Sequence, residues 1–242
     1  MLMWGPLRDL WAVLAKDLLI ELRTREILYS MVLFAVLVVV VFAFAFLGVA
    51  PLQVASPAGA GGEAGTLQRL LAPGILWTAI TFAGTLGLNR IASRELDGDC
   101  LTGLVTSPAS RGGIFFGKMA SSLLFLLAME ALLLPLIVLL FGLDLQPRLG
   151  WHLLALLLGS LGFCALGTLF STMLLNARLR EVLLPLVFYP LVTPVIIAGV
   201  KSTAALLAGE SATAFTWLKL LLAFDVVFTT AAAWAFGWTV GE

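Results

Sequence analysis

The residues of this sequence that could carry out chemistry are few, and several lie together in one short polar segment. Residues 94–108 read R-E-L-D-G-D-C-L-T-G-L-V-T-S-P, with three carboxylates within five positions. Carboxylates around a glycine could hold a divalent cation for phosphoryl transfer, but the further spaced aspartates of such a site are absent. Aspartates beside glycine also form helix-breaking turns. A membrane phosphotransferase with its site at Asp97 and Gly98 is therefore an alternative and not the main hypothesis.

A second segment resembles a nucleotide site. Residues 112–119 read G-G-I-F-F-G-K-M, close to the phosphate-binding pattern G-x-x-x-x-G-K-[ST]. Met119 stands where Ser or Thr would reach Mg²⁺, and no buried strand precedes the segment. We therefore expect no nucleotide site here, and any ATP hydrolysis belongs to a separate chain.

Three more residues are notable because apolar stretches surround them. Glu130 and Asp225 each lie inside such a stretch, where an isolated charge costs about 3 kcal/mol. We expect these carboxyl groups to face a cavity, a polar contact within the protein or a subunit interface. His152 is the only histidine and follows Trp151, so we expect an interfacial residue. It is a weak haem-binding candidate because one imidazole provides a single ligand, and no metal site is predicted.

The composition explains why polar residues are so rare. With 61% hydrophobic and 12% charged residues the chain is a membrane protein, and its net charge of zero lacks the basic face that nucleic acid requires. A spanning helix needs about 20 mostly apolar residues. Six windows qualify: 31–50, 70–90, 119–141, 150–174, 182–200 and 216–238. We predict an all-α membrane protein with six transmembrane helices in a single domain, 1–242. Small residues four apart, such as Ala155 and Gly159, predict close helix packing.

Positive charges predict the orientation, since cytoplasmic connections carry the excess of Lys and Arg. Four of the 14 basic residues fall on one side: Arg69, Arg148, Lys201 and Lys219. The other ten fall on the side that holds both termini and residues 94–108. Both termini and this segment are therefore expected in the cytoplasm.

An amphipathic helix is predicted over 5–28, before the first span. Apolar residues recur there at spacings of three and four, among them Leu7, Trp11 and Leu14. Glu21 and Arg25 stand four apart and predict an ion pair along this helix. Such a helix either docks on the bilayer surface alone or also contacts a partner protein.

The segment 94–108 is best interpreted as a docking element. Its leucines can line one side and its carboxylates the other, and Pro108 ends it. Gly98 and Gly103 weaken an isolated helix by about 1 kcal/mol each relative to Ala. The segment therefore needs a surface to dock against, either the bilayer or a soluble subunit.

Several motifs together resemble one family. They are L-A-P-G-I-L-W at 71–77, L-N-R at 88–90, the segment 94–108, and Lys118. This combination is similar to the haem exporter protein B (CcmB) family, whose fold is that of type 2 ABC permeases, the type V exporter fold. The resemblance implies a permease of the bacterial inner membrane that is not itself an enzyme. It also implies a homodimer that works with a cytoplasmic ATPase (CcmA-like), a haem-handling membrane protein (CcmC-like) and a small helper (CcmD-like).

The resemblance further implies a function and a coupling site. ATP hydrolysis on the partner would drive haem translocation, or release of a haem-loaded chaperone, in c-type cytochrome biogenesis. The expected ATPase-coupling residues are Glu95, Leu96, Asp97, Gly98, Leu101, Leu104 and Pro108. Haem is a possible substrate, and no resident cofactor is expected. A permease for lipid, glycan or drug export with the same architecture is the alternative.

Overall fold

The computed structural model describes residues 5–47, 63–97, 110–174, 177 and 179–239, and its regular elements are helices. In chain order they are α1 (Gly5–Thr24), α2 (Glu26–Leu47), α3 (Glu63–Asp97), α5 (Arg111–Phe141), the 3-10 helix η1 (Gln146–Arg148), α6 (Leu149–Met173), α7 (Arg180–Ala208) and α8 (Ser211–Thr239). Six of these, α2, α3 and α5 to α8, are long and apolar enough to cross a membrane. The prediction of an all-α protein with six spans is confirmed.

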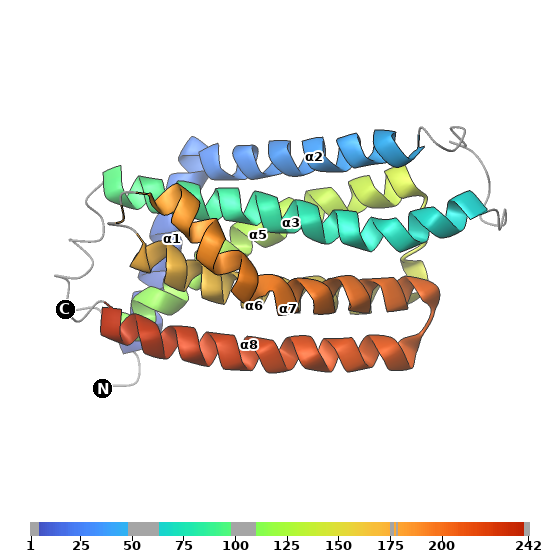
Figure 1. Cartoon of the computed structure of the whole chain (residues 1–242). Helices are drawn as coiled ribbons and strands as arrows, with labels where there is room; N and C mark the ends of the chain where they lie inside the picture. The colour runs from blue at the N-terminus through green and yellow to red at the C-terminus, as the bar shows by residue number, and fades with distance from the viewer. Residues whose placement is uncertain (1–4, 48–62, 98–109, 175–176, 178, 240–242) are drawn as a thin grey trace.

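The spanning helices form a bundle around α3 and α6 (Figure 1). The helix α3 packs against α2, α5 and α7, while α6 packs against α5, α7 and α8. These two central helices are the most buried of the six. The short helix α1 lies at the end of the bundle where α3 ends and α5 begins, and it packs mainly along α5.

Several helices extend beyond the predicted windows. The helix α3 continues to Asp97 instead of ending near residue 90, and α5 begins at Arg111 instead of residue 119. A hydropathy window ends at the first charged residues. The helix itself can continue through these residues, because its backbone hydrogen bonds also form outside the hydrocarbon. Residues 94–97, predicted to begin a separate cytoplasmic segment, are therefore the last turn of α3.

The predicted helix over 5–28 is interrupted at one residue. Arg25 has a φ of 53° and separates α1 from α2. Its left-handed backbone turns the chain, because an α-helix cannot continue through that conformation. The amphipathic element is therefore Gly5–Thr24, and the next residues already begin the first span.

Close packing in the core depends on a tryptophan from the 71–77 motif. Trp77 is 2% exposed, and its indole lies against Gly159 of α6 and Gly199 of α7. A Cβ at Gly199 would stand 2.5 Å from Cε2 and Cζ2 of the ring. The indole Nε1 donates a hydrogen bond to Thr203 Oγ1 at 3.1 Å. The packing role predicted for Gly159 is confirmed, and the partner is this aromatic ring.

Candidate functional site

The predicted coupling segment connects two described helices. Glu95, Leu96 and Asp97 belong to the last turn of α3. Four predicted coupling residues lie outside the described residues: Gly98, Leu101, Leu104 and Pro108. The chain is described again from Ser110, the N-cap of α5. Both flanks of the segment are thus defined, and both are bound by α1.

The first flank is held by a buried carboxylate near the end of α1. Glu21 Oε2 accepts a hydrogen bond from Arg94 Nη1 at 3.1 Å, and Glu21 Oε1 accepts one from the Leu28 backbone N–H at 2.8 Å. Arg94 Nη2 also donates to Thr24 Oγ1 at 3.1 Å. Only 6% of the Glu21 side chain is exposed, so these charge-assisted bonds are shielded from water. They join α1, the start of α2 and the end of α3.

The second flank is held by an aspartate near the start of α1. Asp9 Oδ2 accepts hydrogen bonds from the Ser110 backbone N–H at 2.9 Å and from Ser110 Oγ at 3.1 Å. Ser110 Oγ in turn accepts from the Gly113 N–H at 3.2 Å, which caps the start of α5. A carboxylate at a helix N-terminus also interacts favourably with the helix dipole.

Through these two contacts α1 connects the end of α3 to the start of α5. Asp9 and Glu21 are separated by 12 residues, which corresponds to about 18 Å along a helix. We call Asp9, Glu21 and their partners the α1 brace; the partners are Ser110, Leu28 and Arg94. The brace fixes the positions at which the chain leaves α3 and enters α5.

A glycine of α5 lets α1 approach closely between these contacts. A Cβ at Gly117 would stand 2.8 Å from Val13 Cβ and 3.0 Å from the Leu10 carbonyl oxygen. Gly117 belongs to the stretch that resembles a phosphate-binding loop. In the structure residues 112–119 lie within the continuous helix α5. This glycine therefore has a packing function, since any side chain would push α1 away.

The turn between α1 and α2 is strained, and the brace stabilises it. Arg25 adopts a left-handed backbone that persists in non-glycine residues only where the surroundings fix it. The bond from Glu21 to Leu28 spans this turn, and Arg90 Nη1 lies 3.0 Å from Glu26 Oε1 just beyond it. The predicted pair of Glu21 with Arg25 is not what the structure shows: Glu21 binds Arg94 instead, because Arg25 has left the helix.

The outward side of α1 remains apolar and exposed. Leu7, Trp11 and Leu22 are 65–70% exposed, while Val13 and Leu14 are buried in the bundle. The helix therefore has two apolar faces, one used in packing and one available to its surroundings. An exposed stripe of this kind is typical of helices that lie in a membrane interface.

The two intramembrane carboxyl groups lie inside the bundle. Glu130 and Asp225 are each 3% exposed. Ser160 Oγ of α6 donates to Glu130 Oε1, and Asp225 Oδ1 packs against the bare backbone at Gly162. Among the described residues Glu130 Oε2 and both Asp225 oxygens have no hydrogen-bond partner, and neither residue forms an ion pair. Both groups are buried within one chain, and a functional role for them stays a prediction.

The histidine is buried between the helices. His152 is 3% exposed, whereas its neighbour Trp151 is 42% exposed and packs edge-on against Phe215. His152 Nδ1 lies 3.0 Å from the Arg148 carbonyl oxygen, and Nε2 has no partner among the described residues. The helical turn at 148–152 directs this ring inward and Trp151 outward, and the interfacial depth expected for His152 stays a prediction.

Comparison with known proteins identifies the group to which the chain belongs. The CcmB protein family matches residues 8–241, a range that contains the whole α1 brace. A "Heme exporter protein B" of Paracoccus denitrificans is 32% identical over 166 residues, covering 68% of this chain and 75% of that protein. A "Heme exporter protein B" of Pseudomonas aeruginosa is 30% identical over 176 residues, covering 72% and 77%. Because the family match extends over nearly all of its length, the chain belongs to the CcmB protein family.

Proposed function

We propose that this chain is the permease subunit of an ABC transporter for haem export or delivery in c-type cytochrome biogenesis. The family match over residues 8–241 carries the proposal, and the relatives named Heme exporter protein B support it. Six helices of spanning length agree with a permease. In this proposal the chain is not an enzyme, and ATP hydrolysis takes place on a separate CcmA-like ATPase subunit.

The proposed complex lies in the bacterial inner membrane. A homodimer of this chain would assemble with two ATPase subunits, a CcmC-like haem-handling protein and a CcmD-like helper. The excess of Lys and Arg supports a cytoplasmic location for the end of the bundle that holds α1. Both termini and the segment 94–108 would then face the ATPase.

The α1 brace supports the proposed coupling function of the segment 94–108. Both flanks of the segment are tied to one rigid helix through Asp9 and Glu21. A displacement of the segment by the ATPase would therefore reach α1 first. From α1 it would pass to α2 through the Leu28 contact and to α5 through the close approach at Gly117. Rigid helices joined by buried contacts are suited to carry such a movement.

Haem enters this proposal as a substrate and not as a resident cofactor. His152 is the only histidine, and it is buried among apolar residues, so no haem-binding residue is assigned to this chain. ATP hydrolysis would drive either haem translocation or release of the haem-loaded chaperone. The brace serves both routes, since each requires only that movement of the ATPase reaches the membrane helices.

The coupling proposal can be tested with charge substitutions in the segment. The double variant Leu101→Asp with Leu104→Asp should lose co-purification with the ATPase while it still inserts into the membrane. A matched control is Thr102→Asp, which adds a charge to the predicted acidic side and should leave binding intact. Unchanged ATPase binding in the double variant would contradict the coupling function.

The substrate class can be tested in a deletion strain. Loss of the chain should remove holo-cytochromes c and leave other envelope components unchanged, and the wild-type chain should restore them. Normal cytochromes c with an altered lipid or glycan profile would contradict haem delivery. An activity that persists without any ATPase and is lost in Asp97→Asn would instead favour the phosphotransferase alternative.

A further inference from the structure

A hollow that the proposed coupling does not use lies on the surface where η1 leads into α6. Figure 1 shows this connection at the end of the bundle opposite α1. We call it the η1 hollow; it is lined by Gln146, Arg148, Leu149, Gly150, Trp151 and Leu154. Its volume of about 520 Å³ lies within the range of about 300–1,000 Å³ that small-ligand sites occupy. The hollow therefore has room for a lipid headgroup.

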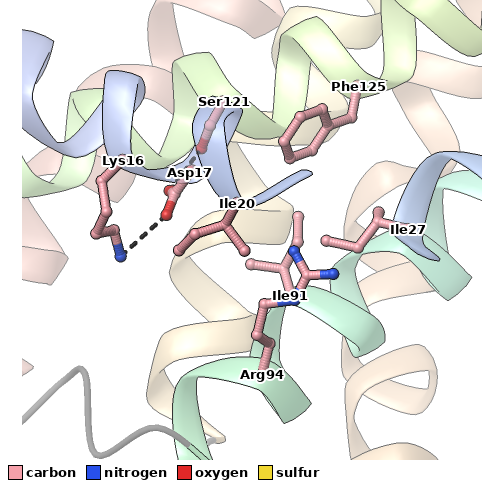
Figure 2. A pocket seen from close by; sticks show the side chains of 8 residues that line it. All are labelled: Lys16, Asp17, Ile20, Ile27, Ile91, Arg94, Ser121 and Phe125. Atoms are coloured by element: carbon pink, nitrogen blue, oxygen red, sulfur yellow. Dashed lines mark hydrogen bonds and ion pairs between the residues drawn. The ribbon is translucent and has the colours of Figure 1, made fainter. Parts of the chain in front are cut away.

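The space where α1 meets the bundle is different, although charged side chains surround it as well. It holds only about 30 Å³, and Lys16 Nζ lies 2.9 Å from Asp17 Oδ1 there (Figure 2). Arg94 faces the same space and is bound to Glu21. This space is too small for a headgroup and its charges are already paired, so it is no ligand site.

The charge of the η1 hollow comes from one arginine. Arg148 Nη1 donates to the Leu206 carbonyl oxygen at 3.3 Å, which uses one of the five N–H donors of the guanidinium. Among the described residues Arg148 forms no ion pair, and no carboxylate lines the hollow. Asp144, two positions before Gln146, accepts from the Gln146 backbone N–H at 3.1 Å. Arg148 is thus a half-buried cation with donors left for an anion.

The other side of the hollow is aromatic and apolar. The indole of Trp151 packs edge-on against Phe215 with ring centroids 4.6 Å apart, which holds the exposed part of the ring in place. Tryptophan with one exposed edge is typical of the interface between headgroups and hydrocarbon. Leu149, Leu153 and Leu157 stand four residues apart along α6 and are each 40–49% exposed. They form an apolar track that leads from the hollow along the span.

We propose that the η1 hollow binds one anionic phospholipid, such as phosphatidylglycerol. The guanidinium of Arg148 donates to the phosphate, for which its fork of N–H groups is suited, and the headgroup lies beside Trp151. An acyl chain follows the apolar track of α6, which a soluble anion would leave uncovered. A zwitterionic headgroup also carries an ammonium, and the lining offers no carboxylate to receive it. The lipid would bind whatever molecule the chain transports.

Native mass spectrometry of the full chain in detergent tests this proposal. Delipidated protein receives phosphatidylglycerol, phosphatidylethanolamine or phosphatidylcholine with identical acyl chains. One phosphatidylglycerol per chain should be retained about fivefold better than either other lipid, as expected for one basic residue at the membrane surface. Arg148→Gln should abolish this preference. Lys201→Gln removes an exposed charge of α7 outside the hollow and should leave the preference unchanged.

A second variant blocks the hollow and keeps the arginine. Gly150 lines the hollow, and an added Cβ there meets no atom within 4 Å. Gly150→Trp should therefore fold and reduce the retention of phosphatidylglycerol to that of phosphatidylcholine. Gly112→Trp is the matched control and should retain the lipid. Gly112 is also the second residue of a spanning helix, its added Cβ also meets no atom within 4 Å, and it lies at the other end of the bundle.

Each other outcome overturns the proposal. Equal retention of the three lipids means that only surrounding bilayer lipid binds. Equal losses in Arg148→Gln and Lys201→Gln mean that anionic lipid follows the general positive charge of the surface. Competition by glycerophosphoglycerol, which has no acyl chains, at equal concentration means that the ligand is soluble. Unchanged lipid retention in Gly150→Trp refutes the site even if Arg148→Gln fails to fold, and loss of a co-purifying subunit from that variant would then mark the hollow as a protein interface.

Discussion

Trp77 occupies a slot that Gly159 of α6 and Gly199 of α7 leave for its ring, and this slot gives a sharp prediction. Of two glycines inside helices, Gly199 lines the slot and Gly74 does not. Gly199→Ala places a methyl group 2.5 Å from the indole ring of Trp77, a distance at which the ring has to move. Gly74→Ala is the matched control: Gly74 also lies inside a helix, in the same motif as Trp77, and nothing stands within 4 Å of its added Cβ.

The stabilising and destabilising effects of these substitutions on the free energy of unfolding can be estimated separately. Alanine is favoured over glycine inside a helix by about 1 kcal/mol, and this gain applies to both variants. Overpacking of a well-packed core costs about 1–3 kcal/mol. Displacement of the indole also weakens its hydrogen bond to Thr203, which contributes about 1 kcal/mol. We therefore expect Gly199→Ala to lower the free energy of unfolding by about 1–3 kcal/mol and Gly74→Ala to leave it unchanged or raise it.

Thermal unfolding in detergent, followed by intrinsic tryptophan fluorescence, measures the difference. For a chain of this length a loss of about 2 kcal/mol lowers the midpoint by about 4–8 °C. In a Trp77→Leu background the added methyl no longer meets the ring, so Gly199→Ala should cause no further loss. Equal midpoints for Gly199→Ala and Gly74→Ala would refute the interpretation of the slot, as would full additivity with Trp77→Leu.

Three other substitutions test the brace, the turn and the interior carboxyl group. Glu21→Gln should lower the free energy of unfolding by about 2–3 kcal/mol in detergent, because Arg94 then loses its buried partner. The control Glu26→Gln, at an exposed site, should cost less than about 1 kcal/mol, and similar losses in both variants would contradict the brace. Arg25→Gly should raise the unfolding midpoint, corresponding to about 1 kcal/mol of relieved backbone strain, whereas a lower midpoint would show that the turn is unstrained. Glu130→Gln keeps an oxygen that accepts from Ser160, so circular dichroism and the unfolding midpoint should stay close to wild type, and a large loss would show that a charge is needed there.

The number and type of the main elements could be predicted from the sequence because they depend on local properties. A segment that crosses hydrocarbon must be apolar over about 20 residues and must pair its own backbone, so each span is visible without knowledge of its neighbours. The amphipathic spacing before the first span is visible for the same reason, and α1 is found there. The family resemblance rested on short motifs around residues 71–118, and the match over 8–241 confirmed it.

Contacts between distant residues could not be predicted in this way. Asp9 and Ser110 are 101 positions apart, and Glu21 and Arg94 are 73 positions apart. Local spacing favoured Arg25 as the partner of Glu21, but the left-handed backbone of Arg25 removed it from the helix. His152 and Trp151 are neighbours in the sequence, and only the packing of α6 shows which of the two rings is buried.

The sequence alone thus determined that the chain is a six-span helical membrane protein with a polar segment between its second and third spans. Hydrocarbon imposes that result on each segment separately. Only the tertiary structure decided that α1 binds both flanks of that segment and that Trp77 occupies a slot between two glycines. Each of these features requires side chains from several helices at once, and the relative rotation and depth of those helices is set by their mutual packing and not by any single segment.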